Sequence, residues 1–257
     1  MLMGFGLSIE PQLWALLFAM VRVGSAFIAA PVFSNMAIPL PARIALTGAI
    51  GVLVQGVTHI TPPPEIFSLT TFLAIAAEAL IGLAMGFVLQ IAFAAPMVAS
   101  EVISMSMGLG FANTVDPTSG HSTPAIGTFL SLMLTLLFLA VDGHLVLVDL
   151  VVRSYAVMPP GAWISPDRLL GIAMFGGYTF LAGLLLSLPI GFLLLCLNLI
   201  VGMLSRAAPA LNLFAVGLPA SLLFGVIAML LALPAMGDYL VVIIREALTM
   251  MPQLVLG

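Results

Sequence analysis

The chain has 257 residues, of which 63% are apolar and only 6% are charged. Soluble globular domains are about 45–50% apolar and about 25% charged, so this composition excludes a water-soluble surface and indicates an integral membrane protein or a subunit buried in an apolar assembly. The net charge of −4 argues against nucleic-acid partners, which bind basic patches.

Apolar stretches follow one another along the chain, and a helix needs about 20 such residues to cross a bilayer. We expect helical segments at residues 13–33, 44–60, 67–95, 125–151, 169–201 and 211–233, and a shorter one at 239–251. The second segment is barely long enough to span, and the third and fifth are too long for one perpendicular crossing. We therefore predict an all-α integral membrane protein of kinked helical hairpins, not a simple six-pass bundle, with residues 1–257 forming one domain.

Local signals predict where some helices begin, bend or approach one another. Ser165 is a good N-cap and Pro166 suits the first helical position, so a helix is expected to begin at Pro166. Pro189 removes a backbone hydrogen bond and is expected to kink the 169–201 segment. Gly82 and Gly86 form a G-x-x-x-G pattern that lets helix backbones approach closely, either within the chain or against another subunit.

Polar side chains inside apolar segments are costly in lipid and therefore suggest functional sites. Four stand out: Arg22, Glu78, Gln90 and Asn198. Glu78 could relay protons with Asp142 and Asp149 in an ion-coupled transporter, and His144 could titrate near neutral pH. Transporters commonly repeat a pattern in two halves, and this chain shows no such repeat. The alternative for Asp142-Gly143-His144 is a simple turn.

The sequence shows little catalytic or metal-binding chemistry. It has neither the G-x-S-x-G pattern of a hydrolase nor a G-x-x-x-x-G-K-[ST] phosphate loop. Ser131 and His144 are thirteen residues apart, which is a generic pair. His59, His121 and His144 lie in three separate loops, and Cys196 stands alone. We predict no catalytic residue, no metal site and no cofactor.

Residues 104–111, S-M-S-M-G-L-G-F, alternate small and large side chains. The period of two suits an extended segment, whereas a helix would stack Met105 on Leu109 and Met107 on Phe111. Both interpretations fit the sequence. Irregular backbone at membrane depth is tolerated only where it is buried or lines a cavity, so a helix end here would place the stretch at a cavity. Methionine is flexible and would suit a seal around varied contents.

Four blocks, in order along the chain, resemble the FliR family, whose members are export-gate subunits of the bacterial flagellar type III secretion system with counterparts in virulence systems. They are R-V-G-S-A-F-I-A-A-P-V-F-S at 22–34 with I-P-L-P-A-R at 38–43, S-E-V-I-S-M-S-M-G-L-G-F-A-N-T-V-D-P-T-S at 100–119, D-G-H at 142–144, and L-N-L-I-V-G-M-L-S-R-A-A-P-A-L-N-L-F-A-V-G-L-P at 197–219.

The resemblance implies a non-enzymatic subunit of a closed helical cone that is the entrance pore for unfolded export substrates. The cone also contains P- and Q-type subunits, and a B-type gate protein binds near its entrance. The N-terminal part of the chain would resemble a P subunit and the C-terminal part a Q subunit. The expected location is the bacterial inner membrane at the flagellar basal body. A stand-alone secondary transporter or channel is the alternative function.

The resemblance also assigns residues. It implies a pore plug formed by Met107, Gly108, Phe111, Val115, Asp116 and Pro117, with Phe111 facing the pore. The family often has a second aromatic residue where this chain has Thr114, so we expect Met105 and Met107 to help seal the pore. Structural contacts between helices or subunits are expected for Arg22, Glu101, Asn198 and Arg206. Arg206 would alternatively neutralise the C-terminal dipole of its helix.

Overall fold

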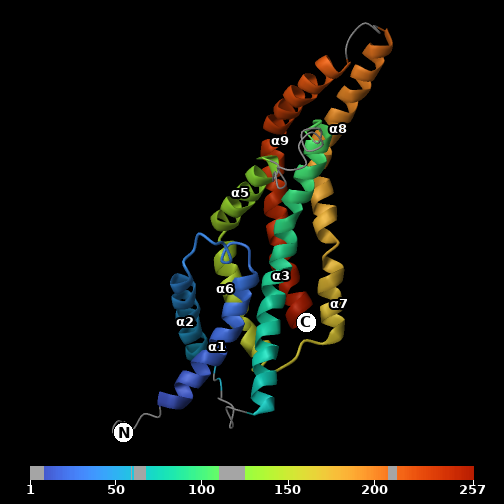
Figure 1. Cartoon of the computed structure of the whole chain (residues 1–257). Helices are drawn as coiled ribbons and strands as arrows, with labels where there is room; N and C mark the ends of the chain where they lie inside the picture. Colours follow the sequence, from blue (N-terminus) through green and yellow to red (C-terminus); the bar gives the residue numbers. More distant parts are fainter. Residues whose placement is uncertain (1–8, 59, 61–67, 110–124, 208–212) are drawn as a thin grey trace. The chain divides into compact units, whose positions relative to one another are not determined.

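The computed structural model describes residues 9–58, 60, 68–109, 125–207 and 213–257 (Figure 1). Its helices are α1 (Ile9–Ala29), α2 (Leu40–Val57), α3 (Leu69–Ser106), α5 (Ala125–Ala140), α6 (Gly143–Val157), α7 (Pro166–Phe175), α8 (Tyr178–Ala207) and α9 (Leu213–Met251), followed by the short π-helix η2 (Pro252–Leu256). The described residues contain no strand. Within this described part of the chain, five helical stretches are long and apolar enough to span a membrane, or six if α5 and α6 count as one bent span. The predicted all-α membrane fold is confirmed.

The chain divides into two compact units that share its longest helices. The first unit contains residues 1–91, 142–176 and 246–257, and the second contains residues 92–141 and 177–245. Both α3 and α9 therefore contribute to each unit. The expected division into a P-like N-terminal part and a Q-like C-terminal part stays a prediction.

In the first unit, α1 packs against α2 and α6, and α7 packs against η2 (Figure 1). The close approach of α3 to α1 depends on the predicted glycine pair. A Cβ atom at Gly86 would lie 2.5 Å from the carbonyl oxygen of Ala26, and one at Gly82 would overlap the carbonyl oxygen of Arg22. The G-x-x-x-G pattern therefore serves a helix contact within the chain, which was one of its two interpretations.

In the second unit, small residues again allow helices to approach closely. A Cβ atom at Gly183 of α8 would lie 2.6 Å from Cβ of Val98 on α3. Phe93 of α3 meets Phe138 of α5 edge to face, with ring centroids 5.4 Å apart. Such aromatic pairs add to the stability that burial alone provides. The interior of this unit is therefore built mainly by apolar packing.

The boundaries of several helices differ from the prediction. The expected 125–151 segment is two helices, α5 and α6, bent by 65° where Asp142 adopts a left-handed conformation with φ of 57°. A turn is therefore present, as predicted, but it lies at Val141 and Asp142, and Gly143 and His144 already belong to α6. The expected segments 211–233 and 239–251 are one helix, α9, which continues through Pro234.

The limits of α3 and of the 169–201 segment also differ from the prediction, whereas the start of α7 agrees with it. Helix α3 does not end near residue 95 but continues through Pro96 to Ser106. Helix α7 begins at Pro166, as predicted, with extended backbone at Ser165, although the Ser165 side chain makes no capping hydrogen bond. The turn at residues 176–177 then separates α7 from α8 within the segment expected at 169–201.

Candidate functional site

A fully buried ion pair joins α1 to α3 in the first unit. The Arg22 guanidinium donates from Nε to Oε2 of Glu78 and from Nη2 to Oε1 of Glu78, each over 2.8 Å. Both side chains have no exposed surface. Two parallel charge-assisted hydrogen bonds of this kind are among the strongest side-chain interactions in proteins.

Four further contacts complete the cluster. Arg22 Nη1 donates to Ser154 Oγ and Arg22 Nη2 to the carbonyl oxygen of Met158, each over 3.0 Å, and the guanidinium lies 4.1 Å from the centre of the Tyr155 ring. Oε1 of Glu78 accepts a hydrogen bond from the backbone N–H of Gly161, also over 3.0 Å. The cluster thus ties α1, α3, α6 and the connection between α6 and α7 together.

In the second unit, one of the residues expected to form a structural contact does contact another helix. Ser221 Oγ of α9 lies 3.1 Å from Oδ1 of Asn198 on α8, to which it donates. Nothing in the local sequence around Ser221 singles it out, because the pair is defined only once the two helices meet. Asn198 therefore contributes a polar contact between helices in an otherwise apolar region.

Four other polar candidates lie at the surface. Glu101 and Arg206 are exposed, and within the described part of the chain neither side chain makes a hydrogen bond or an ion pair. Arg206 is in the last turn of α8, where a cation favours the helix dipole. Gln90 is exposed. Asp149 pairs with Arg153 four residues later, over 2.7 Å, with both side chains largely exposed.

The helical interpretation of S-M-S-M-G-L-G-F holds for its first three residues, and α3 ends at Ser106. Gly108 has a φ of 81°, in the left-handed region that favours glycine. The Leu109 N–H donates to the carbonyl oxygen of Ser104, and the Gly108 N–H to that of Met105, each over 3.0 Å. These two bonds form a Schellman motif, which satisfies the last carbonyl groups of a helix.

The two methionines expected to seal the pore have different surroundings. Met105 is 64% exposed, whereas Met107 is 3% exposed. The structure therefore does not bring them together on one surface. Gly108, which was also assigned to the plug, forms the turn that follows α3. Phe111, Val115, Asp116 and Pro117, and Thr114 in place of the second aromatic residue, lie outside the described residues.

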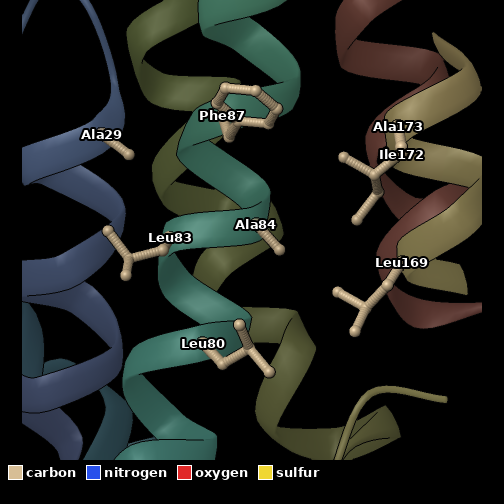
Figure 2. Close-up of a pocket in the computed structure, with 8 residues that line it drawn as sticks. All are labelled: Ala29, Leu80, Leu83, Ala84, Phe87, Leu169, Ile172 and Ala173. Atoms are coloured by element: carbon tan, nitrogen blue, oxygen red, sulfur yellow. The ribbon is translucent and has the colours of Figure 1, made fainter. Parts of the chain in front are cut away.

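An apolar hollow of about 350 Å³ lies between α3 and α7 in the first unit (Figure 2). It is lined by Ala29, Leu80, Leu83, Ala84, Phe87, Leu169, Ile172 and Ala173. Figure 2 shows only hydrocarbon side chains there, so the hollow offers packing surface and no catalytic group. Among the residues that the structure describes, no three His, Cys, Asp or Glu side chains gather where they could hold a metal ion.

Comparisons with known proteins identify the family. Residues 13–247 match the family described as "Bacterial export proteins, family 1". The "Flagellar biosynthetic protein FliR" of Pectobacterium carotovorum subsp. carotovorum is 40% identical over 215 residues, covering 83% of this chain and 82% of the relative. The FliR of Escherichia coli K12 is 34% identical over 221 residues, covering 86% and 84%. The chain belongs to the FliR family of bacterial export proteins. The FliR of Bacillus subtilis 168 is 30% identical over 215 residues and 80% of each chain.

Membership of the FliR family agrees with an all-α integral membrane protein. The structure adds partners that sequence reasoning did not find for this FliR-family chain, namely Ser154, Tyr155 and Gly161 around the ion pair. The only available signal was the presence of one basic and one acidic residue, Arg22 and Glu78, in two apolar segments. Oppositely charged residues inside membrane-spanning segments usually point into the protein and pair with one another.

Proposed function

We propose that this FliR-family chain is a subunit of the flagellar type III secretion export gate, where it helps to form and seal the entrance pore for unfolded export substrates. It acts in the bacterial inner membrane at the flagellar basal body and assembles with P- and Q-type subunits into a helical cone. The B-type gate protein contacts the entrance. The N-terminal part of the chain takes a P-like role and the C-terminal part a Q-like role.

One observation carries the assembly part of this proposal: α3 exposes apolar side chains along a greater length than a bilayer covers. The exposed apolar residues of α3 are Leu69, Phe72, Leu73, Leu83, Phe87, Met97 and Met105. From first to last they extend over about 54 Å of helix at 1.5 Å per residue. The hydrocarbon core is about 30 Å thick, and even a 40° tilt takes only about 39 Å of helix. Other protein subunits are the natural cover for the rest.

The buried ion pair disfavours the alternative of a stand-alone secondary transporter. A proton relay needs a carboxyl group that gains and loses a proton along a water-filled path. Glu78 has no exposed surface and both of its oxygens accept hydrogen bonds from Arg22. The geometry supports a structural role for this carboxylate.

Co-purification tests the assembly proposal. The tagged chain, expressed from its own operon and extracted in mild detergent, should bring P- and Q-type subunits with it and should be degraded when they are deleted. As a control, a tagged unrelated membrane protein should recover neither subunit. Recovery of a stable homo-oligomer that lacks P- and Q-type subunits would reject the export-gate function and favour a stand-alone transporter or channel.

The sealing role requires a separate test. Replacing Met105, Met107 and Phe111 together with glycine should make the membrane leak small ions while assembly, measured by co-purification, is retained. Deleting residues 113–120 tests the plug independently of these three side chains. Unchanged permeability in a fully assembled gate would contradict the sealing role.

A further inference from the structure

We propose that Met107 is a positioning residue, held in a notch at Gly225 of α9, and that this contact sets the direction in which Met105 points. The inference rests on the proposed function only for the sealing role of Met105. The docking of Met107 stands on the geometry of the second unit alone.

The notch fits the methionine closely. A Cβ atom at Gly225 would lie 2.6 Å from Cγ, 2.7 Å from Cε and 2.9 Å from Sδ of Met107. Carbon atoms prefer separations of about 3.5–4.0 Å, so no residue other than glycine fits at position 225 while Met107 keeps this conformation. Met107 is 3% exposed, so its side chain is buried in the second unit.

A second contact from the same helix holds the residue that follows Met107. A Cβ atom at Gly108 would lie 2.7 Å from Cδ2 of Leu218. Leu218 and Gly225 are seven residues apart on α9, and residues at that spacing lie on one face of a helix. One face of α9 therefore meets the turn that ends α3 at two points.

Docking of Met107 has a consequence for Met105. Met107 follows the last residue of α3, but its N–H still donates to the carbonyl oxygen of Ile103 over 2.9 Å, so its position continues the helix. Residues two positions apart do not share a helix face, so when Met107 points toward α9, Met105 points away from it. The exposures of 3% for Met107 and 64% for Met105 agree with this division. The Schellman motif adds a further constraint, because its Gly108 N–H is bonded to the carbonyl oxygen of Met105 itself.

A disulfide test addresses the contact without reference to export. With Cys196→Ala as background, the pair Met107→Cys and Gly225→Cys should cross-link on mild oxidation in the assembled gate. A Gly225 Cβ within 2.6 Å of Met107 Cγ is close enough for the Cβ separation of about 3.5–4.5 Å that a disulfide needs. The matched control is Met105→Cys with Gly225→Cys, which should remain unlinked. Failure of the 107–225 pair to link, or equal linking of the control, would overturn the docking.

A size swap tests positioning against sealing. Gly225→Leu should displace Met107 and raise ion leakage several-fold in an assembled gate, and adding Met107→Ala should return leakage toward the wild-type level by making room for the leucine. The control is Gly237→Leu on the same helix, where an added Cβ meets nothing within 4 Å. It tests the effect of a bulkier residue on α9 away from the notch and should not leak.

The outcomes separate the two proposals. If Gly225→Leu does not leak, or if the double variant leaks as much as Gly225→Leu alone, the positioning role is overturned. If Met105→Gly alone does not leak while the 107–225 disulfide forms, Met105 does not seal the pore and that part of the proposed function fails. The docking of Met107 then still stands.

Discussion

Replacing Glu78 with leucine should strongly destabilise the first unit, because it leaves the Arg22 guanidinium buried and without a counter-charge. Arg22 would lose both 2.8 Å bonds to the carboxylate, and the Gly161 N–H would lose its acceptor. Its bonds to Ser154 Oγ and to the carbonyl oxygen of Met158 would remain, but neither acceptor carries a full charge.

The size of the effect follows from these contacts. Hydrogen bonds to charged groups contribute about 1.5–3 kcal/mol each, and an unsatisfied buried N–H costs about 1–3 kcal/mol. A buried leucine side chain returns about 1.5–3 kcal/mol. The net loss agrees with the roughly 3–5 kcal/mol measured when one partner is removed from a buried ion pair. Replacing Arg22 with methionine in the same chain removes the unpaired charge, so the double variant should lose less than Glu78→Leu alone.

Hydrogen exchange with mass spectrometry on the purified protein measures this locally. A loss of about 3–5 kcal/mol corresponds to amide exchange in α1 and α3 that is roughly a hundred-fold to several-thousand-fold faster. The control is Arg153→Ala, which removes an exposed ion pair with Asp149 and should leave exchange unchanged. Exchange in Glu78→Leu that matches Arg153→Ala, or a double variant less protected than Glu78→Leu, would refute this account of the cluster.

Three further substitutions follow from single contacts. A Cβ atom at Gly86 would lie 2.5 Å from the carbonyl oxygen of Ala26, so Gly86→Leu should push α3 away from α1 and lower the amount of the chain in the membrane. The control is Gly56→Leu, where an added Cβ meets nothing within 4 Å and the amount should stay much higher. Gly108→Ala should cost about 1–2 kcal/mol because its φ is 81°, seen as faster exchange in the last turn of α3. Ser221→Ala should cost about 0.6 kcal/mol, and in a double-mutant cycle with Asn198→Ala the two losses should not add.

Local rules in the sequence predicted those features that depend on neighbouring residues. Pro166 begins α7 because proline suits a first helical position, whatever the rest of the chain does. Gly82 and Gly86 mark a close helix contact because only glycine leaves room for another backbone. The turn at Asp142 is of the same kind, since aspartate tolerates left-handed backbone better than most residues.

Local rules could not predict features that depend on residues far apart in the sequence. The length of α9 was underestimated because Pro234 and Asp238 suggest a break, yet proline is tolerated in a membrane helix whose freed backbone groups find other partners. The alternation of Met105 and Met107 suggested a common sealing role for the two residues. Met105 is instead exposed, whereas Met107 is buried next to Gly225, which lies more than a hundred residues later in the sequence and which no local pattern connects to Met107.

Helices α1 and α3 differ from α8 and α9 in how much of their surface the chain itself covers. In the apolar stretches, 44% of α1 and 50% of α3 is buried, against 22% for α2, 22% for the stretch from α7 to α8 and 28% for α9. The first unit also contains the buried Arg22–Glu78 cluster, whose hydrogen bonds are directional and tie four segments together. Helices α8 and α9 leave more of their apolar surface to lipid or to other proteins. Side chains on that surface gain no packing energy from the chain itself. The ion-paired contact between α1 and α3 is therefore held mainly by the chain's own packing, whereas α2, α8 and α9 leave more apolar surface uncovered by the chain.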